Sequence, residues 1–366
     1  MRFFNTAGPC ERAWHYMLPA SARLPQARRL VERGSYFVVH APRQTGKTTT
    51  LRELALELTA EGRYAALYFS CEEGQPGQDD LEQAQRALLS QIDDRASDIL
   101  PPELRPPQPW PEAPTLRLLG AGLGAWARAC PRPLVLFFDE IDALQGESLR
   151  SVLRQLRARY PDRPRHFPWS VVLCGMRDVR DYKVASGGDP ARRGSSSPFN
   201  IKVESLTLQA FTREEVSALY AQHTAETGQV FLPEALEQAY TLTQGQPWLV
   251  NALAQQLVDV LVEDRARAIG AGDVERARDI LIERQDTHLD SLVDRLREPR
   301  IRALIEPMLA GTELPQVPAD DVRFAVDLGL VRMTREGGLE VANPIYKEVM
   351  VRCRTPGGRE VAVVRA

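Results

Sequence analysis

The run APRQTGKT at residues 41–48 carries residue types that can bind the phosphates of a nucleotide. It fits the pattern G-x-x-x-x-G-K-[ST], with Ala41 in place of the first glycine. In such a loop, successive backbone N–H groups surround the β-phosphate, and the N-terminus of the next helix adds partial positive charge. We expect Lys47 to reach the β- and γ-phosphates and the Thr48 hydroxyl to bind Mg²⁺. The predicted nucleotide-binding residues of the loop are Ala41, Pro42, Arg43, Gln44, Thr45, Gly46, Lys47, Thr48 and Thr49.

The amino-acid composition supports this interpretation of Lys47. Of the 46 basic residues, only Lys47, Lys183, Lys202 and Lys347 are lysines. A compact ammonium fits between phosphates where a planar guanidinium does not, so an arginine-rich chain has a physical reason to keep lysine here. A match to the pattern by chance has odds of about one in two hundred. The other three lysines have no such motif around them, and we interpret them as surface charge.

A pair of carboxylates follows the apolar run PLVLFF at residues 133–138. Ligands bind at the carboxyl end of the strands in open α/β sheets, so Asp139 is placed to hold Mg²⁺, directly or through water. Glu140 could orient and polarise the water that attacks the γ-phosphate. Asp142 either accepts a hydrogen bond from a loop amide, which we favour, or contacts a neighbouring subunit.

Five short apolar segments must position these residues. They alternate with helices, which predicts a five-stranded parallel sheet with helices on both faces, of the P-loop NTPase α/β class. Strand signals stop near residue 206 and helices follow. After about residue 286, two helices precede a hairpin and a last helix, the order of a winged helix-turn-helix. The predicted strands are 35–40, 65–70, 133–138, 169–175 and 200–206; the predicted domains are 1–205 (α/β), 206–285 (helical lid) and 286–366 (winged helix).

The net charge and the cysteine content argue against several classes of protein. The net charge is −3, which argues against a surface that is uniformly attracted to nucleic acid or to a membrane. The longest apolar runs are far shorter than the ~18 residues of a membrane span. The first residues have no apolar region typical of a secretory signal, and the five cysteines lack any C-x-x-C spacing, which favours the cytoplasm. The five histidines show no metal-ligand spacing, so we predict no structural metal site.

Taken together, A-x-x-x-x-G-K-T and hhhhDEID resemble the Walker elements of a P-loop ATPase of the AAA+/STAND type. More narrowly, FFNTAGPC…HYMLPA, YFVVHAPRQTGKTT, GQPWLVNALA and DLGLV…VANPIYKEV resemble a prokaryotic family of AAA-like ATPases, over residues 3–352. This family is related to initiator-like and archaeal STAND ATPases. Many of its members continue into a nuclease-like domain, for which the tail TPGGREVAVVRA carries no motif, so nuclease activity is not carried over.

The resemblance implies further site residues. Arg177 follows the fourth strand, where AAA+ and STAND proteins place a sensor of the γ-phosphate; the alternative is a surface arginine paired with an aspartate. Pro247 in Gly-Gln-Pro either faces the base and ribose or only starts a helix. Tyr16 and Met17 either line the adenine or belong to an arm that covers the core. No sensor-2 arginine is apparent, which puts motor activity in doubt.

Two functions are favoured over a third, a nucleotide sensor that binds without hydrolysing. The first is a Mg²⁺-dependent ATPase that binds ATP or ADP between core and lid and acts as a molecular switch, contacting a protein partner or another copy of itself. The second is an initiator- or loader-like ATPase whose winged helix, with Arg150, Arg154 and Arg157, contacts duplex DNA. From Arg297 onwards we count eleven basic and ten acidic residues, without a basic stripe, so DNA contact is less favoured. Arg192 and Arg193 could act as an arginine finger in another subunit.

Overall fold

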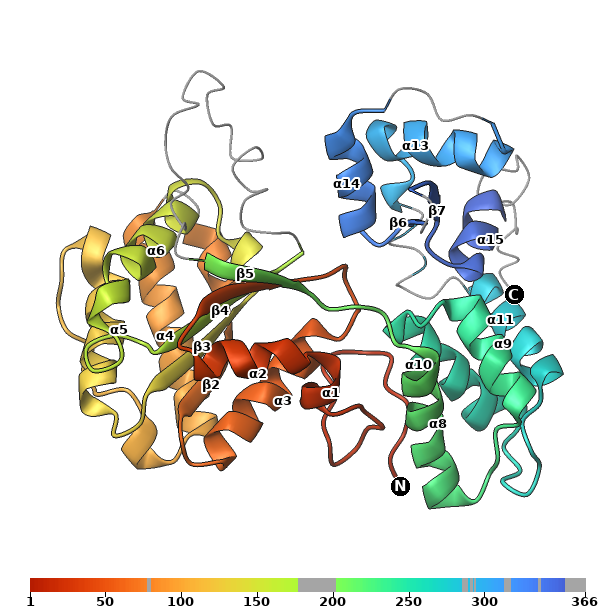
Figure 1. Ribbon diagram of the computed structural model, residues 1–366, viewed down its shortest axis with the longest axis horizontal. Helices are drawn as coiled ribbons and strands as arrows, with labels where there is room; N and C mark the ends of the chain where they lie inside the picture. Colours follow the sequence, from red (N-terminus) through yellow and green to blue (C-terminus); the bar gives the residue numbers. More distant parts are fainter. Residues whose placement is uncertain are drawn as a thin grey trace, which may run out of the picture. The chain divides into compact units, whose positions relative to one another are not determined.

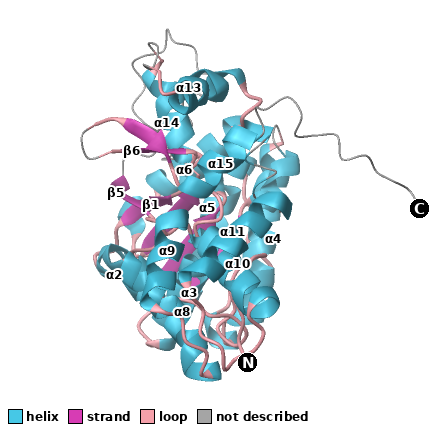
Figure 2. Ribbon diagram, turned by 90° about the vertical axis from the view of Figure 1, so that its right-hand side faces the viewer, coloured by secondary structure: helices cyan, strands magenta, loops and turns pink. Residues whose placement is uncertain are grey.

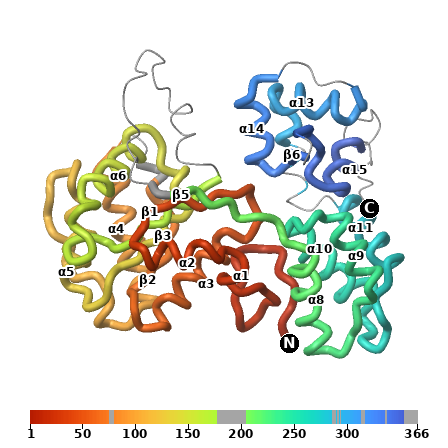
Figure 3. The backbone as a smooth tube through the Cα atoms, in the orientation of Figure 1, coloured from red at the N-terminus to blue at the C-terminus, as the bar shows by residue number. Residues whose placement is uncertain are grey.

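The structure is a computed structural model, which describes residues 1–77, 80–176, 202–284, 289, 292, 294–312, 317–334 and 337–352. Contacts between residues divide the chain into two compact units. One, here called the α/β unit, comprises Pro19–Ala41 and Lys47–Gln209. The other, here called the helical unit, comprises Met1–Leu18, Pro42–Gly46 and Ala210–Ala366. Figure 3 lets the reader follow the chain through each of them.

A five-stranded sheet forms the centre of the α/β unit, in the order β2-β3-β4-β1-β5. Every pairing is parallel, as the alternation of strands and helices predicts. The predicted strands are confirmed to within a residue or two at each end. They are β1 (Tyr36–His40), β2 (Ala65–Ser70), β3 (Leu134–Asp139), β4 (Ser170–Gly175) and β5 (Lys202–Thr207).

Each face of this sheet has its own hydrophobic core, because successive side chains on a strand point to opposite faces. In β3, Leu134, Leu136 and Phe138 join one core, while Val135 and Phe137 join the other. The first core is covered by α4, α5 and α6, and the second by α1, α2 and α3 (Figure 1). The helices are α1 (Ala20–Arg23), α2 (Pro25–Glu32), α3 (Lys47–Ala60), α4 (Leu81–Ile99), α5 (Leu118–Ala129) and α6 (Gly146–Ala158).

Helices make up most of the described part of the helical unit, which has a single buried core (Figure 2). Helix α10 ends at Gln256, where the chain continues into a π-helical turn over Leu257–Leu261. The helices are α8 (Arg213–Thr227), α9 (Pro233–Thr243), α10 (Pro247–Gln256), α11 (Ala271–Arg284), α13 (Pro299–Ala310), α14 (Ala319–Asp327) and α15 (Pro344–Arg352).

The C-terminal elements occur in the predicted order, with a two-stranded antiparallel pair of β6 (Val331–Met333) and β7 (Leu339–Val341) between α14 and α15. Helix α13 begins at Pro299, and the extended dihedral angles of Glu298 break the helical path before it. A residue before proline avoids the helical region, which explains the break. Side chains of α15 share the core of the lid helices, so both segments belong to one unit. Their assignment to separate lid and winged-helix domains stays a prediction.

The first eighteen residues pack with the helical unit, although the sequence order had suggested the α/β domain. Phe4 and Tyr16 are completely or almost completely buried in its core, and Phe4 stacks on Tyr16 with ring centroids 4.8 Å apart. The Arg2 side chain forms an ion pair of 2.6 Å with Glu226 of α8. We therefore describe residues 1–18 as part of the helical core. No helix among the described residues has the length and apolar character needed to cross a lipid bilayer.

Candidate functional site

The loop between β1 and α3 turns tightly. Gln44 and Gly46 both have positive φ angles, of 59° and 82°, which turn the chain tightly before α3 begins at Lys47. A Cβ on Gly46 would have open space around it, so its left-handed backbone is the reason for glycine at this position. The Thr45 hydroxyl donates to the Pro42 carbonyl at 2.8 Å and closes the turn. Ala41, which replaces the first glycine, is buried.

Lys47 lies at the first position of α3, where the helix begins directly after the loop. Its Nζ donates a hydrogen bond of 2.7 Å to the carbonyl oxygen of Ala41, so the side chain folds back along the loop. Burial lowers the pKa of this ammonium, and the Cys174 thiol and the Asp139 carboxylate act in the opposite direction. The amino group is therefore held beside the loop that is predicted to bind phosphate.

Asp139 ends β3 and is 1% exposed. One carboxylate oxygen, Oδ2, accepts hydrogen bonds from the Thr48 hydroxyl at 2.7 Å and from the Tyr68 hydroxyl at 2.8 Å. The other, Oδ1, accepts the backbone N–H of Glu140 at 2.9 Å. The structure thus brings Thr48 and Asp139 together, although they lie 91 positions apart. A hydroxyl and a carboxylate are oxygen donors of the kind that Mg²⁺ binds, so this pair fits that ion.

Glu140 has a strained backbone, with φ 53° and ψ 41° in the left-handed region. Such a conformation costs about 1–3 kcal/mol for a residue other than glycine and persists only where its surroundings hold it. Its N–H is held by Asp139, and its carboxylate accepts a hydrogen bond of 2.9 Å from the Ser70 hydroxyl. The strain turns Glu140 away from the path of β3 and fixes its carboxylate beside the end of β2.

The environment of Glu140 also changes its acidity. Partial burial, reinforced by the negative charges of Glu72 and Asp139, raises its pKa to about 7, while the hydrogen bond from Ser70 acts to lower it. A general base is most effective when its pKa lies near the working pH. A carboxylate of this strength is suited to accept a proton from water at neutral pH.

The predicted sensor, Arg177, lies outside the described residues, as do Arg192 and Arg193. The strand before Arg177 is described: β4 pairs with both β1 and β3, so its carboxyl end lies between those of β1 and β3. The backbone N–H of Met176 donates to Asp142 at 3.3 Å, in agreement with the structural role that we favour for that aspartate. The role of Arg177 stays a prediction.

Tyr16 and Met17, the N-terminal residues predicted to line the adenine, belong to the helical unit. Tyr16 is 1% exposed, and its hydroxyl contacts Nδ1 of His223 and Oε2 of Glu226, both at 3.3 Å. Met17 is partly exposed, and its backbone exchanges hydrogen bonds with the Gln222 side chain. The burial of Tyr16 favours the second interpretation, an arm that completes the core. That either residue lines an adenine stays a prediction.

Pro247 is the first residue of α10 and is buried. The Gln246 side chain caps this helix by accepting the N–H of Leu249 at 2.6 Å. Gly245 has φ 73°, and a Cβ there would overlap the carbonyl oxygen of Phe211. Helix capping and close packing therefore explain why glycine, glutamine and proline occur at these three positions, without a bound ligand. A further contact of Pro247 with a nucleotide stays a prediction.

The arginines of α6 lie on the side opposite its buried apolar residues, as the helical periodicity indicates. Arg150 pairs with Glu147, and Arg154 lies 3.8 Å from the same carboxylate. This neighbouring acid offsets part of the positive charge. The geometry of α6 therefore gives no separate support for a contact with DNA.

Two functional candidates were missed by reasoning from the sequence, Tyr68 and Ser70 at the end of β2. Ser70 pairs with Asp139 in the sheet, and Tyr68 pairs with Phe137 two positions earlier. The Tyr68 hydroxyl donates a hydrogen bond to Asp139, the predicted metal ligand, and the Ser70 hydroxyl donates one to Glu140, the predicted catalytic residue. A usable signal existed, since AALYFS carries two hydroxyl residues among its last three positions, near the carboxyl end of a strand. Its value depended on knowing that β2 neighbours β3.

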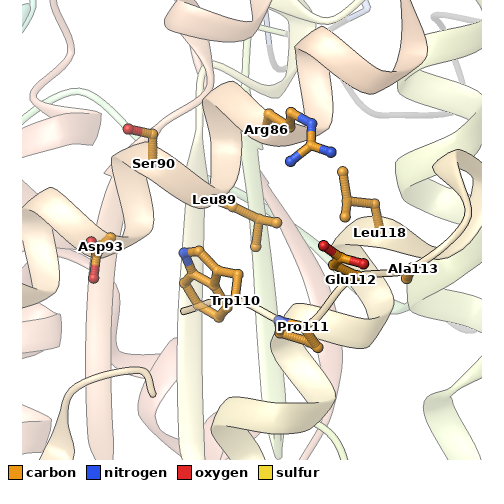
Figure 4. Close-up of a pocket in the computed structure, with 9 residues that line it drawn as sticks. All are labelled: Arg86, Leu89, Ser90, Asp93, Trp110, Pro111, Glu112, Ala113 and Leu118. Atoms are coloured by element: carbon orange, nitrogen blue, oxygen red, sulfur yellow. The ribbon is translucent and has the colours of Figure 1, made fainter. Parts of the chain in front are cut away.

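A separate cavity of about 440 Å³ lies between α4, α5 and the proline-rich segment that connects them. Figure 4 shows the indole of Trp110 beside Leu89, with the carboxylates of Asp93 and Glu112 at different sides of the cavity. Nε1 of Trp110 is buried and has no hydrogen-bond partner among the described residues. The cavity contains none of the residues predicted from the sequence.

The sheet, the loop and the acidic end of β3 define the fold as that of a P-loop NTPase. Residues 30–182 match the family described as "AAA domain". This part of the chain is therefore similar to AAA domains, as the resemblance of its motifs implies.

The chain is also similar to solved structures of other proteins. A Walker-type ATPase of Pyrococcus abyssi is 14% identical, with a TM-score of 0.65, over 95% of this chain and 99% of that one. The RuvB Holliday junction branch migration motor of Thermotoga maritima is 18% identical, with a TM-score of 0.46, over 90% and 93%. Cdc6p of Pyrobaculum aerophilum is 15% identical, with a TM-score of 0.43, over 91% of each chain. We base no inference on the last two. A search of curated proteins gave no match.

Proposed function

We propose that this protein binds ATP with Mg²⁺ and hydrolyses it slowly, acting as a nucleotide-dependent switch for a protein partner or for its own assembly. The observation that carries the proposal is the hydrogen bond of 2.7 Å between Thr48 and Asp139. It joins the start of α3, next to the phosphate loop, to the acidic end of β3. The match to an AAA domain supports the same conclusion.

Each residue has a distinct part in the proposed reaction. Backbone N–H groups of the loop and the ammonium of Lys47 would bind the phosphates. Thr48 and Asp139 would hold Mg²⁺, which neutralises phosphate charge when it is bound. Glu140 would orient water and accept its proton, for which a pKa of about 7 is suited. Arg177 could stabilise negative charge on the γ-phosphate, a role that rests on the resemblance alone.

ATP binding and turnover by three variants test the proposal. Lys47→Ala should weaken ATP binding about 10–100-fold, because a hydrogen bond to a charged group contributes about 1.5–3 kcal/mol. Glu140→Gln should bind ATP as the parent does but turn it over about 10²–10⁴-fold more slowly. Lys347→Ala is the matched control, since Lys347 is an exposed lysine of α15. Equal ATP affinity of the parent and Lys47→Ala would refute the proposal.

The switch role needs its own measurement. Light scattering of the whole chain, with and without a non-hydrolysable ATP analogue, reports the oligomeric state. Protection from limited proteolysis reports a change within one chain. We expect the analogue to alter at least one of them, because a switch must differ between its nucleotide states. If neither responds at saturating analogue, the protein is an ATPase without the proposed switch.

A further inference from the structure

The hydroxyl of Tyr68 donates a hydrogen bond to Asp139, a candidate Mg²⁺ ligand, from a position that no motif assigns. Tyr68 belongs to β2 and pairs with Phe137, while Ser70 pairs with Asp139. Tyr68 is therefore a diagonal neighbour of Asp139 on the face covered by α3. Its hydroxyl and that of Thr48 approach the same oxygen, Oδ2, at 2.8 and 2.7 Å. Three elements, β2, β3 and α3, thus meet at one carboxylate oxygen.

The carboxylate of Asp139 can rotate unless both of its oxygens are held. The Glu140 N–H holds Oδ1. On Oδ2, the Thr48 hydroxyl is also the predicted Mg²⁺ ligand, so it cannot be devoted to orienting Asp139. Tyr68 has no other predicted task, and its ring is packed in the core under α3, which fixes the position of its hydroxyl. Groups that orient a metal ligand in this way influence metal affinity strongly.

We propose that Tyr68 is a positioning residue of the nucleotide site, whose hydroxyl orients the Asp139 carboxylate so that it and Thr48 can hold Mg²⁺ together. This inference rests on the proposed function. It assigns Tyr68 no direct contact with the metal or the nucleotide. It therefore predicts a defect that appears only when Mg²⁺ takes part in binding.

The test is a titration with MgCl₂ and a fluorescent ATP analogue, using the parent, Tyr68→Phe and Tyr36→Phe. Tyr68→Phe should need about 10–100-fold more Mg²⁺ for half-maximal enhancement of analogue binding, the usual effect of losing such an orienting partner. Its affinity for the analogue in EDTA should equal that of the parent, which also shows that the variant is folded. Tyr36→Phe is the matched control. Tyr36 is a buried tyrosine of the same sheet whose hydroxyl donates to the Pro168 carbonyl at 2.9 Å, so its variant should keep the parent's Mg²⁺ dependence.

The outcomes separate this inference from the proposed function. If the parent shows Mg²⁺-enhanced binding and Tyr68→Phe has the same half-maximal Mg²⁺ concentration, the positioning role is refuted and the proposed function stands. If Tyr68→Phe loses affinity equally in MgCl₂ and in EDTA, its role is general packing, and the inference is likewise overturned. If the parent does not bind the analogue under any condition, the proposed function fails, and this inference fails with it.

Discussion

Replacing Glu140 with glutamine should change how the stability of the α/β unit depends on pH. The pKa of Glu140 is raised from 4.5 to about 7, mainly by burial. Between these values the native chain binds more protons than the unfolded chain, so the free energy of unfolding falls as the pH rises. Glutamine has a similar shape, stays uncharged and can still accept the hydrogen bond from Ser70. The variant should therefore lose this pH-dependent cost.

The size of the effect follows from the shift. Without solvent screening, raising the pKa by about 2.5 would correspond to a cost of about 3.4 kcal/mol for ionising Glu140 in the folded chain. The side chain of Glu140 is only half-buried, and solvent screening reduces the value, so we expect about 1–2 kcal/mol. Glu140→Gln should thus gain stability over the parent between pH 5 and pH 8, with little difference at the acidic end.

Hydrogen exchange of the peptide that contains β3, followed by mass spectrometry in EDTA, measures the stability of the α/β unit. Parent and variant are compared at the same pH, so that the intrinsic exchange rate cancels. Glu103→Gln is the control, because Glu103 is an exposed glutamate of the same unit and its replacement should leave the pH dependence unchanged. A difference between Glu140→Gln and the parent that stays constant from pH 5 to pH 8 would refute the reasoning.

Two further predictions concern the helical unit, and urea denaturation measures both. Gly245→Ala should lower the free energy of unfolding by about 2–5 kcal/mol, because alanine disfavours φ 73° by about 1–2 kcal/mol and its Cβ would overlap the Phe211 carbonyl. Gly228→Ala, with φ 79° but open space around it, should cost only the first part; equal losses would contradict the role of packing. Phe4→Ala should cost about 3–5 kcal/mol, because Phe4 is fully buried. Phe3→Ala, at a side chain 45% exposed, should cost far less, and a similar loss would argue against the N-terminal segment as part of the core.

Local patterns predicted the elements of the α/β unit well. A strand such as LVLFFD, buried on both faces, and a loop with a fixed lysine spacing are visible in the sequence alone. The meeting of Lys47, Thr48 and Asp139 at one edge could be anticipated, because parallel strands end on the same side of a sheet. The structure adds the contact itself, a hydrogen bond across 91 positions.

Features that depend on strand order or on distant packing could not be predicted. Tyr68 became a candidate only when β2 proved to neighbour β3. The left-handed backbone of Glu140 has no sequence signal, since glutamate rarely adopts it. Burial of Phe4 and Tyr16 beside α8 depends on contacts across about two hundred positions, which periodicity does not report. The break before Pro299 is different, because a proline that disfavours a helical residue before it is visible in the sequence.

The division of the helical unit along the chain has a consequence for biosynthesis. Residues 1–18 are made first, but their partners in the core begin at Ala210. At roughly 5–20 residues per second, translation reaches those partners about 10–40 s after the N-terminal segment is made. The α/β unit, which ends at Gln209, can fold in the meantime. Phe4 and Tyr16 are then exposed apolar side chains on a nascent chain, so the ribosome-bound intermediate, rather than the finished protein, is the form that most needs chaperone protection.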